Sequence, residues 1–163
     1  MTTRPRPARL VRGLVRRVAG VMAPPQALAF WADRLAPGMD VGRARVLQRR
    51  RESADAVTLV LQPGRGWGGC QPGQHVSIGA EIDGRRVRRS YSPTAIRADG
   101  RIEITVKRVA GGKLSGVLCD DVAVGAWLDI GPAFGEMTLP AQPDAPLLFL
   151  AAGSGITPLV SMT

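Results

Sequence analysis

Cysteine and histidine are scarce in this chain of 163 residues, which holds two cysteines and one histidine. Cys70 and Cys119 have no CxxC spacing, so we expect neither a disulfide framework nor a metal site, and a reduced, cytosolic compartment fits best. With His75 alone, a histidine-based catalytic triad has too little to build on. Any redox chemistry must therefore come from a bound organic cofactor.

Aromatic residues are also few, at 4%, and no uninterrupted apolar run reaches the ~18 residues that a membrane-spanning helix needs. We therefore expect no transmembrane segment and no stacking platform for single-stranded nucleic acid. The formal net charge is +9, of which residues 1–40 carry +5 through seven arginines against Asp33 and Asp40. This basic balance suits an anionic membrane, an anionic cofactor, an acidic protein or double-stranded nucleic acid, and its sign alone does not choose among them.

The arginines of the N-terminal arm, residues 1–41, follow a helical period. Between residues 4 and 22 the apolar side chains share one arc and the arginines take the opposite side, which predicts an amphipathic helix. Such a helix fits a peripheral contact with anionic lipid, and it also fits an arm that packs on the body of the protein. A second short helix is expected at residues 26–35, and Pro37-Gly38 ends the arm.

From Gly42 onward the apolar period changes to two residues, which is typical of strands. We expect strands at residues 43–52, 56–62, 75–82, 85–92 and 101–109, with further short strands at 127–130 and 137–139 and one short helix within residues 111–121. Asp83-Gly84 is a strong signal for a two-residue hairpin turn. These runs amount to about six strands. The expected fold is all-β with a short helix, a six-stranded antiparallel barrel over residues 42–141, because closure removes exposed strand edges.

The last segment, residues 146–163, changes character again. Leu147–Ala152 is a continuous apolar run, as expected for a buried parallel strand, and it leads into Gly153-Ser154-Gly155. Thr157-Pro158 marks a helix start, with proline in the first turn. These features predict the opening of an α/β nucleotide-binding domain, and we expect the chain to be a truncated fragment that carries only the first strand and turn of that domain.

Two further segments suit a phosphorylated cofactor. In Arg89-Ser90-Tyr91-Ser92, strand alternation puts Arg89 and Tyr91 on one face, where a guanidinium suits a phosphate and a phenol ring suits a flat heterocycle. In Val106–Ser115, glycines let the backbone approach a ligand, and the N–H groups at a helix start bind anions. Each segment alone also fits an ordinary surface strand or glycine turn, and their order along the chain is the specific signal.

In this order, the segments resemble the ferredoxin–NADP reductase superfamily, and most closely the bacterial ferredoxin reductases that end in a two-iron, two-sulfur domain. The resemblance covers roughly residues 28–163 and implies an FAD-binding barrel followed by a truncated NAD(P)-binding domain. The segments that carry it are Pro72–Val76, Arg89–Ser92, Val106–Ser115, Gly131–Gly135 and Leu147–Met162.

The resemblance implies a role for each residue of the first segment. Arg89 would bind the FAD pyrophosphate with Ser90 beside it, and Tyr91 would pack on the flavin or its ribityl chain. Ser92, the candidate catalytic residue, would steer the flavin N5. Pro93 departs from the family pattern, in which an aliphatic residue is more usual.

The remaining cofactor-binding residues follow from the same resemblance. Val106 and Lys107 would contact the adenosine side of FAD, and Thr157 would reach the flavin edge. The pyrophosphate would be held by four consecutive residues, Gly112, Lys113, Leu114 and Ser115. The NAD(P) site would begin at three more, Gly153, Ser154 and Gly155. No metal ligand is implied.

The implied function is that of an FAD-dependent NAD(P)H oxidoreductase, a flavoprotein that transfers electrons from NAD(P)H through FAD to an iron–sulfur or ferredoxin-type acceptor. A ferredoxin, a desaturase or a cytochrome would be the redox partner, and a two-iron, two-sulfur cluster belongs to the protein only if a further C-terminal domain exists. We expect the chain alone to be inactive or weakly active, because catalysis depends on holding the nicotinamide against the flavin.

Two alternatives stay open. One is a non-catalytic basic β-barrel module that binds an anionic membrane or nucleic acid, although the few aromatic residues give no reason to expect a nucleic-acid partner. The other is a different class of flavin reductase, with oxygen, an iron–siderophore or a monooxygenase as electron acceptor. We expect a cytoplasmic location, with residues 4–22 as the segment for peripheral membrane contact.

Overall fold

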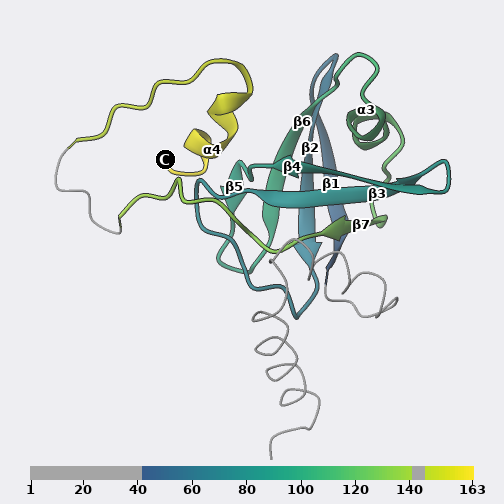
Figure 1. Cartoon of the computed structure of the whole chain (residues 1–163), viewed down its shortest axis with the longest axis horizontal. Helices are drawn as coiled ribbons and strands as arrows, with labels where there is room; N and C mark the ends of the chain where they lie inside the picture. Colours follow the sequence, from purple (N-terminus) through teal and green to yellow (C-terminus); the bar gives the residue numbers. More distant parts are fainter. Residues whose placement is uncertain (1–41, 141–145) are drawn as a thin grey trace, which may run out of the picture. The chain divides into compact units, whose positions relative to one another are not determined.

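The computed structural model describes residues 42–140 and 146–163, so the predicted helical arm lies outside the described residues. Within them are seven strands, two α-helices and one 3-10 helix (Figure 1). None of these helices has the length and apolarity to cross a membrane. In chain order the elements are β1 (Arg43–Ser53), β2 (Ala56–Pro63), β3 (Val76–Ile82), β4 (Arg85–Tyr91), β5 (Ala95–Ile96), β6 (Ile102–Lys107), α3 (Lys113–Asp120), β7 (Trp127–Ile130), η1 (Gly153–Gly155) and α4 (Ile156–Val160).

All seven strands form one antiparallel sheet in the order β4-β3-β7-β1-β2-β6-β5. In Figure 1, β3 and β4 run across β1, β2 and β6, so the sheet is strongly curled. The end strands β4 and β5 are not paired with each other in the described part of the chain, and the result is a half-barrel. The expectation of a mostly β fold with a short helix is confirmed, whereas the expected six strands and closed barrel are not.

The extra strand, β5, is too short for alternation to reveal. Thr94, just before β5, donates its N–H to the Glu103 carbonyl of β6 at 2.8 Å. The Glu103 side chain is only 9% exposed, and its carboxylate pairs with Arg97, just after β5, and with Arg50 of β1 at 3.7 Å. The backbone hydrogen bond of Thr94 and the Arg97–Glu103 ion pair flank this two-residue strand, which no local period encodes.

Two expected strands do not form in the described residues. Residues 137–139 lie outside any strand, and the earlier Phe134 forms a single antiparallel bridge with His75 instead. The run 147–152 forms no buried strand either, since Leu148 and Leu150 are 84% and 83% exposed. A parallel strand exists only when a neighbouring strand pairs with it, and no described strand pairs with this run.

The core lies inside the curl, under α3. This helix contacts β2, β3, β4 and β6, so it covers strands that are far apart in the sheet order. The buried core residues come from the inward faces of the strands, from α3 and from the second residue after it: Ala44, Val46, Val57, Leu59, Leu61, Val76, Ile78, Ile102, Ile104, Val106, Leu114, Leu118, Cys119, Val122, Leu128 and Ile130.

A bulge in β1 places an arginine against the C-terminal end of α3. The register of β1 against β2 shifts between Val46 and Gln48, which changes the direction of the following side chains. The half-buried Arg49 then donates from Nη2 to the carbonyl oxygen of Cys119, in the last turn of α3. A cation at this end also complements the helix dipole, so β1 anchors α3 to the sheet.

Graded truncation of Ile104 tests the position of the core. This side chain is fully buried on β6. We expect Ile104→Val to lower the free energy of unfolding by about 0.5–1.5 kcal/mol and Ile104→Ala by about 2–5 kcal/mol, because each leaves core space unfilled. Denaturant unfolding followed by circular dichroism measures both. Val124, 61% exposed, is the control, and Val124→Ala should change the value by less than about 0.5 kcal/mol. Equal losses at both positions would contradict this core.

Candidate functional site

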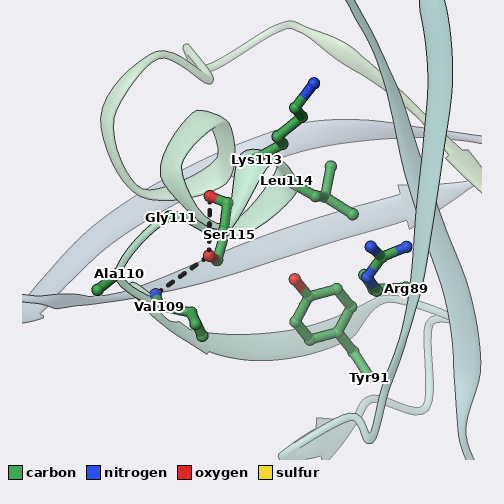
Figure 2. Close-up of a pocket in the computed structure, with 9 residues that line it drawn as sticks. Arg89, Tyr91, Val109, Ala110, Gly111, Lys113, Leu114 and Ser115 are labelled. Atoms are coloured by element: carbon green, nitrogen blue, oxygen red, sulfur yellow. Dashed lines mark hydrogen bonds between the residues drawn. The ribbon is translucent and has the colours of Figure 1, made fainter.

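A pocket of about 390 Å³ opens between the end of β4 and the loop that leads into α3 (Figure 2). Arg89 and Tyr91 of β4 line one side, and residues 109–115 line the other. Its volume falls in the range of about 300–1,000 Å³ that is usual for small-molecule and cofactor sites. The fold therefore brings together the two segments that the sequence singled out, although Val109, Ala110 and Gly111 had not been named as site residues.

The β3–β4 hairpin places Arg89 and Tyr91. Asp83 and Gly84 have φ of 52° and 69°, which is the left-handed backbone that both central residues of a type I′ turn require. The register then continues without a slip from this turn to the pair Val76 and Tyr91. Arg89 and Tyr91 both line the pocket, which confirms that they share a face of β4.

The loop between β6 and α3 is fixed by its own hydrogen bonds. The Gly112 N–H donates to the Val109 carbonyl oxygen at 2.9 Å, and the Val109 N–H donates to Ser115 Oγ at 3.1 Å. The Ser115 hydroxyl in turn donates to the Gly112 carbonyl oxygen at 3.4 Å, and the residue is only 7% exposed. Ser115 thus shapes the wall of the pocket through its side chain.

The N-terminal end of α3 faces this pocket without a side-chain cap. Gly112 occupies the N-cap position and, as a glycine, has no side chain to cap the first N–H groups of the helix. The first N–H groups of a helix lack acceptors within the helix, and the positive end of the helix dipole attracts anions. Lys113 adds a positive charge at the rim, with its ammonium pointing away from Tyr91 (Figure 2). This end of the pocket is therefore suited to a phosphate.

Arg89 supplies the opposite wall with a guanidinium. Its Nη1 donates to the carbonyl oxygen of Arg88 at 2.7 Å. No carboxylate of the described residues pairs with Arg89 or with Lys113. A guanidinium carries several N–H donors in a planar fork, so Arg89 keeps donors for an anionic ligand.

Tyr91 keeps its phenol proton in this setting. Burial raises the pKa of the half-buried phenol above its ordinary value, the nearby Cys119 adds to this rise, and the Arg89 charge partly offsets it. The Cys119 thiol has a raised pKa as well, chiefly through burial. Near neutral pH, Tyr91 therefore offers a neutral ring and a hydroxyl donor to the pocket.

Several predicted site residues lie outside the pocket lining. Ser90 is exposed on β4 and pairs with Ser77 across the hairpin. Val106 is fully buried in the core, so only its backbone is available to a ligand, and the exposed Lys107 pairs with Asp55 at 3.4 Å.

The same holds for the C-terminal residues. Gly153, Ser154 and Gly155 form η1, and Thr157 lies in α4 with its hydroxyl donating to the Ser154 carbonyl oxygen at 2.9 Å. None of these four residues lines the pocket.

Ser92 has a partner that the sequence reasoning missed. Its Oγ lies 2.6 Å from Nδ1 of His75. The hairpin turn at Asp83-Gly84 could have predicted this pair, because an antiparallel hairpin that is in register from this turn places residue 75 opposite residue 92.

This geometry suits a phosphorylated aromatic cofactor on a curled antiparallel sheet. Residues 43–138 match the family model described as the oxidoreductase FAD-binding domain, and the chain belongs to this family. The match confirms the resemblance to the ferredoxin–NADP reductase superfamily.

Known relatives extend beyond this domain. The chain is 40% identical over 124 residues to a flavohemoprotein of Pseudomonas aeruginosa, a match that covers 75% of this chain and 31% of that protein. It is 41% identical over 125 residues to an NADPH oxidoreductase of Mycobacterium tuberculosis, covering 74% and 33%. The chain thus spans about a third of the length of the curated relatives it matches. The FAD/NAD-binding domain of nitric oxide dioxygenase from Vibrio cholerae has the same fold, with a TM-score of 0.67 and 27% identity over 76% of this chain and 55% of that one.

Because Tyr91 is the only tyrosine, its ionisation can be read directly. We expect the absorbance change of tyrosinate to occur at higher pH in the folded chain than in denaturant, since burial raises the pKa of Tyr91. The neutral phenol therefore stabilises the fold below its unfolded pKa, and this contribution is lost as the pH rises through the folded value. Arg89→Ala should move the folded transition further upward. A transition unaffected by Arg89→Ala would contradict the proximity of these two side chains.

Two glycines at the start of α3 provide a matched test of the loop. A Cβ on Gly112 would lie 2.6 Å from Ser115 Oγ and 3.0 Å from Val109 Cβ, whereas a Cβ on Gly116 meets nothing within 4 Å. We expect Gly112→Ala to displace Ser115 and lower the melting temperature. Gly116→Ala should leave it unchanged or raise it, because alanine favours a helix over glycine by about 1 kcal/mol. Thermal unfolding measures both, and the opposite order would refute the role given to Ser115.

Proposed function

We propose that this chain is the FAD-binding part of a flavoprotein that oxidises NAD(P)H and reduces a one-electron acceptor, an iron–sulfur or ferredoxin-type centre or a haem. The observation that carries the proposal is the pair of cationic walls on the two sides of one pocket: Arg89, which no carboxylate of the described residues pairs with, and the uncapped start of α3. A diphosphate between them would be neutralised from both directions. Family membership favours this function over a non-catalytic basic module.

The residues present fit FAD. Arg89 and the backbone of Gly112–Ser115 would hold the diphosphate, and Tyr91 would offer its ring and hydroxyl to the flavin or its ribityl chain. Val106 and Lys107 would lie on the adenosine side, with Ser90 beside Arg89. When bound, FAD supplies the redox chemistry, and the chain contributes position and electrostatics.

Ser92 is the proposed catalytic residue, a hydrogen-bonding group at the flavin N5. A hydroxyl both donates and accepts, so it can stay bonded to an atom whose protonation changes. Further along the chain, Gly153, Ser154 and Gly155 would begin the NAD(P) site, and Thr157 would reach the flavin edge. The proposed division is therefore an arm (1–41), an FAD-binding barrel (42–141) and the start of an NAD(P)-binding domain (146–163).

Retention of FAD tests the proposal. We expect the purified chain to keep added FAD after desalting, and Arg89→Ala to raise the Kd about tenfold or more, since a hydrogen bond to a charged group contributes about 1.5–3 kcal/mol. Arg85→Ala, which removes the same charge from the turn end of the same strand, should change the Kd less than about twofold. Fluorescence titration measures each Kd. A chain that circular dichroism shows to be folded and β-rich, yet that binds no FAD, would refute the proposal.

A further inference from the structure

The pair of His75 and Ser92 is a polar contact that the pocket does not account for. His75 precedes β3 and Ser92 follows β4, so the two residues face each other just past the last pair of the hairpin, Val76 and Tyr91. The Nδ1 and Oγ atoms are 2.6 Å apart, and both residues are half-buried. This short contact lies one residue beyond the tyrosine that lines the pocket.

Contacts with Phe134 and Gly135 hold His75 in place. The His75 N–H donates to the Phe134 carbonyl oxygen at 2.8 Å, and the Phe134 N–H donates back to the His75 carbonyl oxygen at 2.9 Å. The two rings pack with centroids 5.6 Å apart at 60°. Gly135, with φ of 102°, lies close to the ring, because a Cβ there would lie only 3.1 Å from His75 Cδ2. These contacts accompany an imidazole whose Nδ1 faces Ser92.

The hydroxyl of Ser92 is restricted as well. The hairpin ladder fixes the residue before it, and the buried Pro93 fixes the backbone after it. Within the described residues, His75 is the side chain that bonds to Ser92 Oγ. The tautomer of His75 then decides the direction of this hydrogen bond. An unprotonated Nδ1 accepts the bond from the Ser92 hydroxyl, and a protonated Nδ1 donates to the hydroxyl oxygen.

We infer that His75 is a positioning residue whose Nδ1 accepts a hydrogen bond from the Ser92 hydroxyl. The Ser92 oxygen is then left as a hydrogen-bond acceptor for an N–H of the bound cofactor. The inference rests on the proposed function. Among the described residues no carboxylate bonds to the imidazole to hold a proton on Nδ1. The imidazole proton is then carried on Nε2, beside Gly135, which is exposed. An oxygen that only accepts stabilises the reduced flavin, which carries the N–H, over the oxidised flavin.

The first test needs no cofactor, because His75 is the only histidine of the chain. Long-range proton–nitrogen NMR on the full chain reports which ring nitrogen carries the proton. We expect Nδ1 to be an unprotonated acceptor in the wild type, and the signal to move toward the free-imidazole mixture in Ser92→Ala. Identical spectra for the two chains, or a protonated Nδ1 in the wild type, would overturn the inference.

The second test reads the bound cofactor. In the FAD-loaded chain at a fixed dye potential, His75→Phe should lower the ratio of reduced to oxidised flavin about twofold to twelvefold, the effect of one lost hydrogen bond of about 0.5–1.5 kcal/mol. The Kd for oxidised FAD should change less than about twofold. Phenylalanine keeps the ring packing on Phe134, whereas His75→Asn loses the ring and restores an acceptor near the position of Nδ1. We therefore expect asparagine to recover the ratio and phenylalanine not to.

The reverse order, with His75→Phe like the wild type and His75→Asn impaired, would show a packing role and overturn the inference. The inference fails alone if FAD binds and neither variant changes the ratio. A wild-type chain that binds no FAD overturns the proposed function and this inference together. The NMR spectra of the chain without FAD show independently whether the His75–Ser92 contact exists.

Discussion

The register of the β3–β4 hairpin is the constraint on which the candidate site depends. Side chains alternate strictly along a strand, so a slip of one residue would send Arg89 and Tyr91 to the opposite face and separate His75 from Ser92. The left-handed backbone of Asp83 and Gly84 excludes such a slip, because the type I′ turn closes on one pairing only.

The same alternation separates two arginines that are neighbours in sequence. Arg88 lies on one face of β4, where its side chain crosses Gly79 and approaches Asp129 of β7 at 3.4 Å. A Cβ on Gly79 would lie 2.6 Å from Arg88 Cγ, so glycine makes this crossing possible. Arg89 lies on the other face and has no carboxylate partner in the described chain. One arginine thus connects β4 to β7, and its neighbour lines the pocket.

The helix α3 connects the core to the pocket because it is fixed at both ends. Arg49 holds its C-terminal end, and the Ser115 hydroxyl holds the loop at its N-terminal end. Between them, Leu114 and Leu118 are buried in the core. Polar side chains satisfy the groups that shape the loop, and the first N–H groups of the helix remain directed at the pocket. Packing therefore fixes in advance the geometry that an anion would meet.

The sequence by itself determined the antiparallel β class, the hairpin turn, the short helix after β6 and the two segments that line the pocket. These features follow from local backbone preferences and from which face of a strand is apolar, and both can be read residue by residue. The tertiary structure alone decided the short strand β5, which pairs with β6, and the lack of pairing at residues 137–139 and 147–152. It also decided that Ser115 bonds within its own loop and that Ser92 meets His75. Strand partners and hydrogen-bond partners are chosen through space, and a local pattern shows only that a residue is available for them.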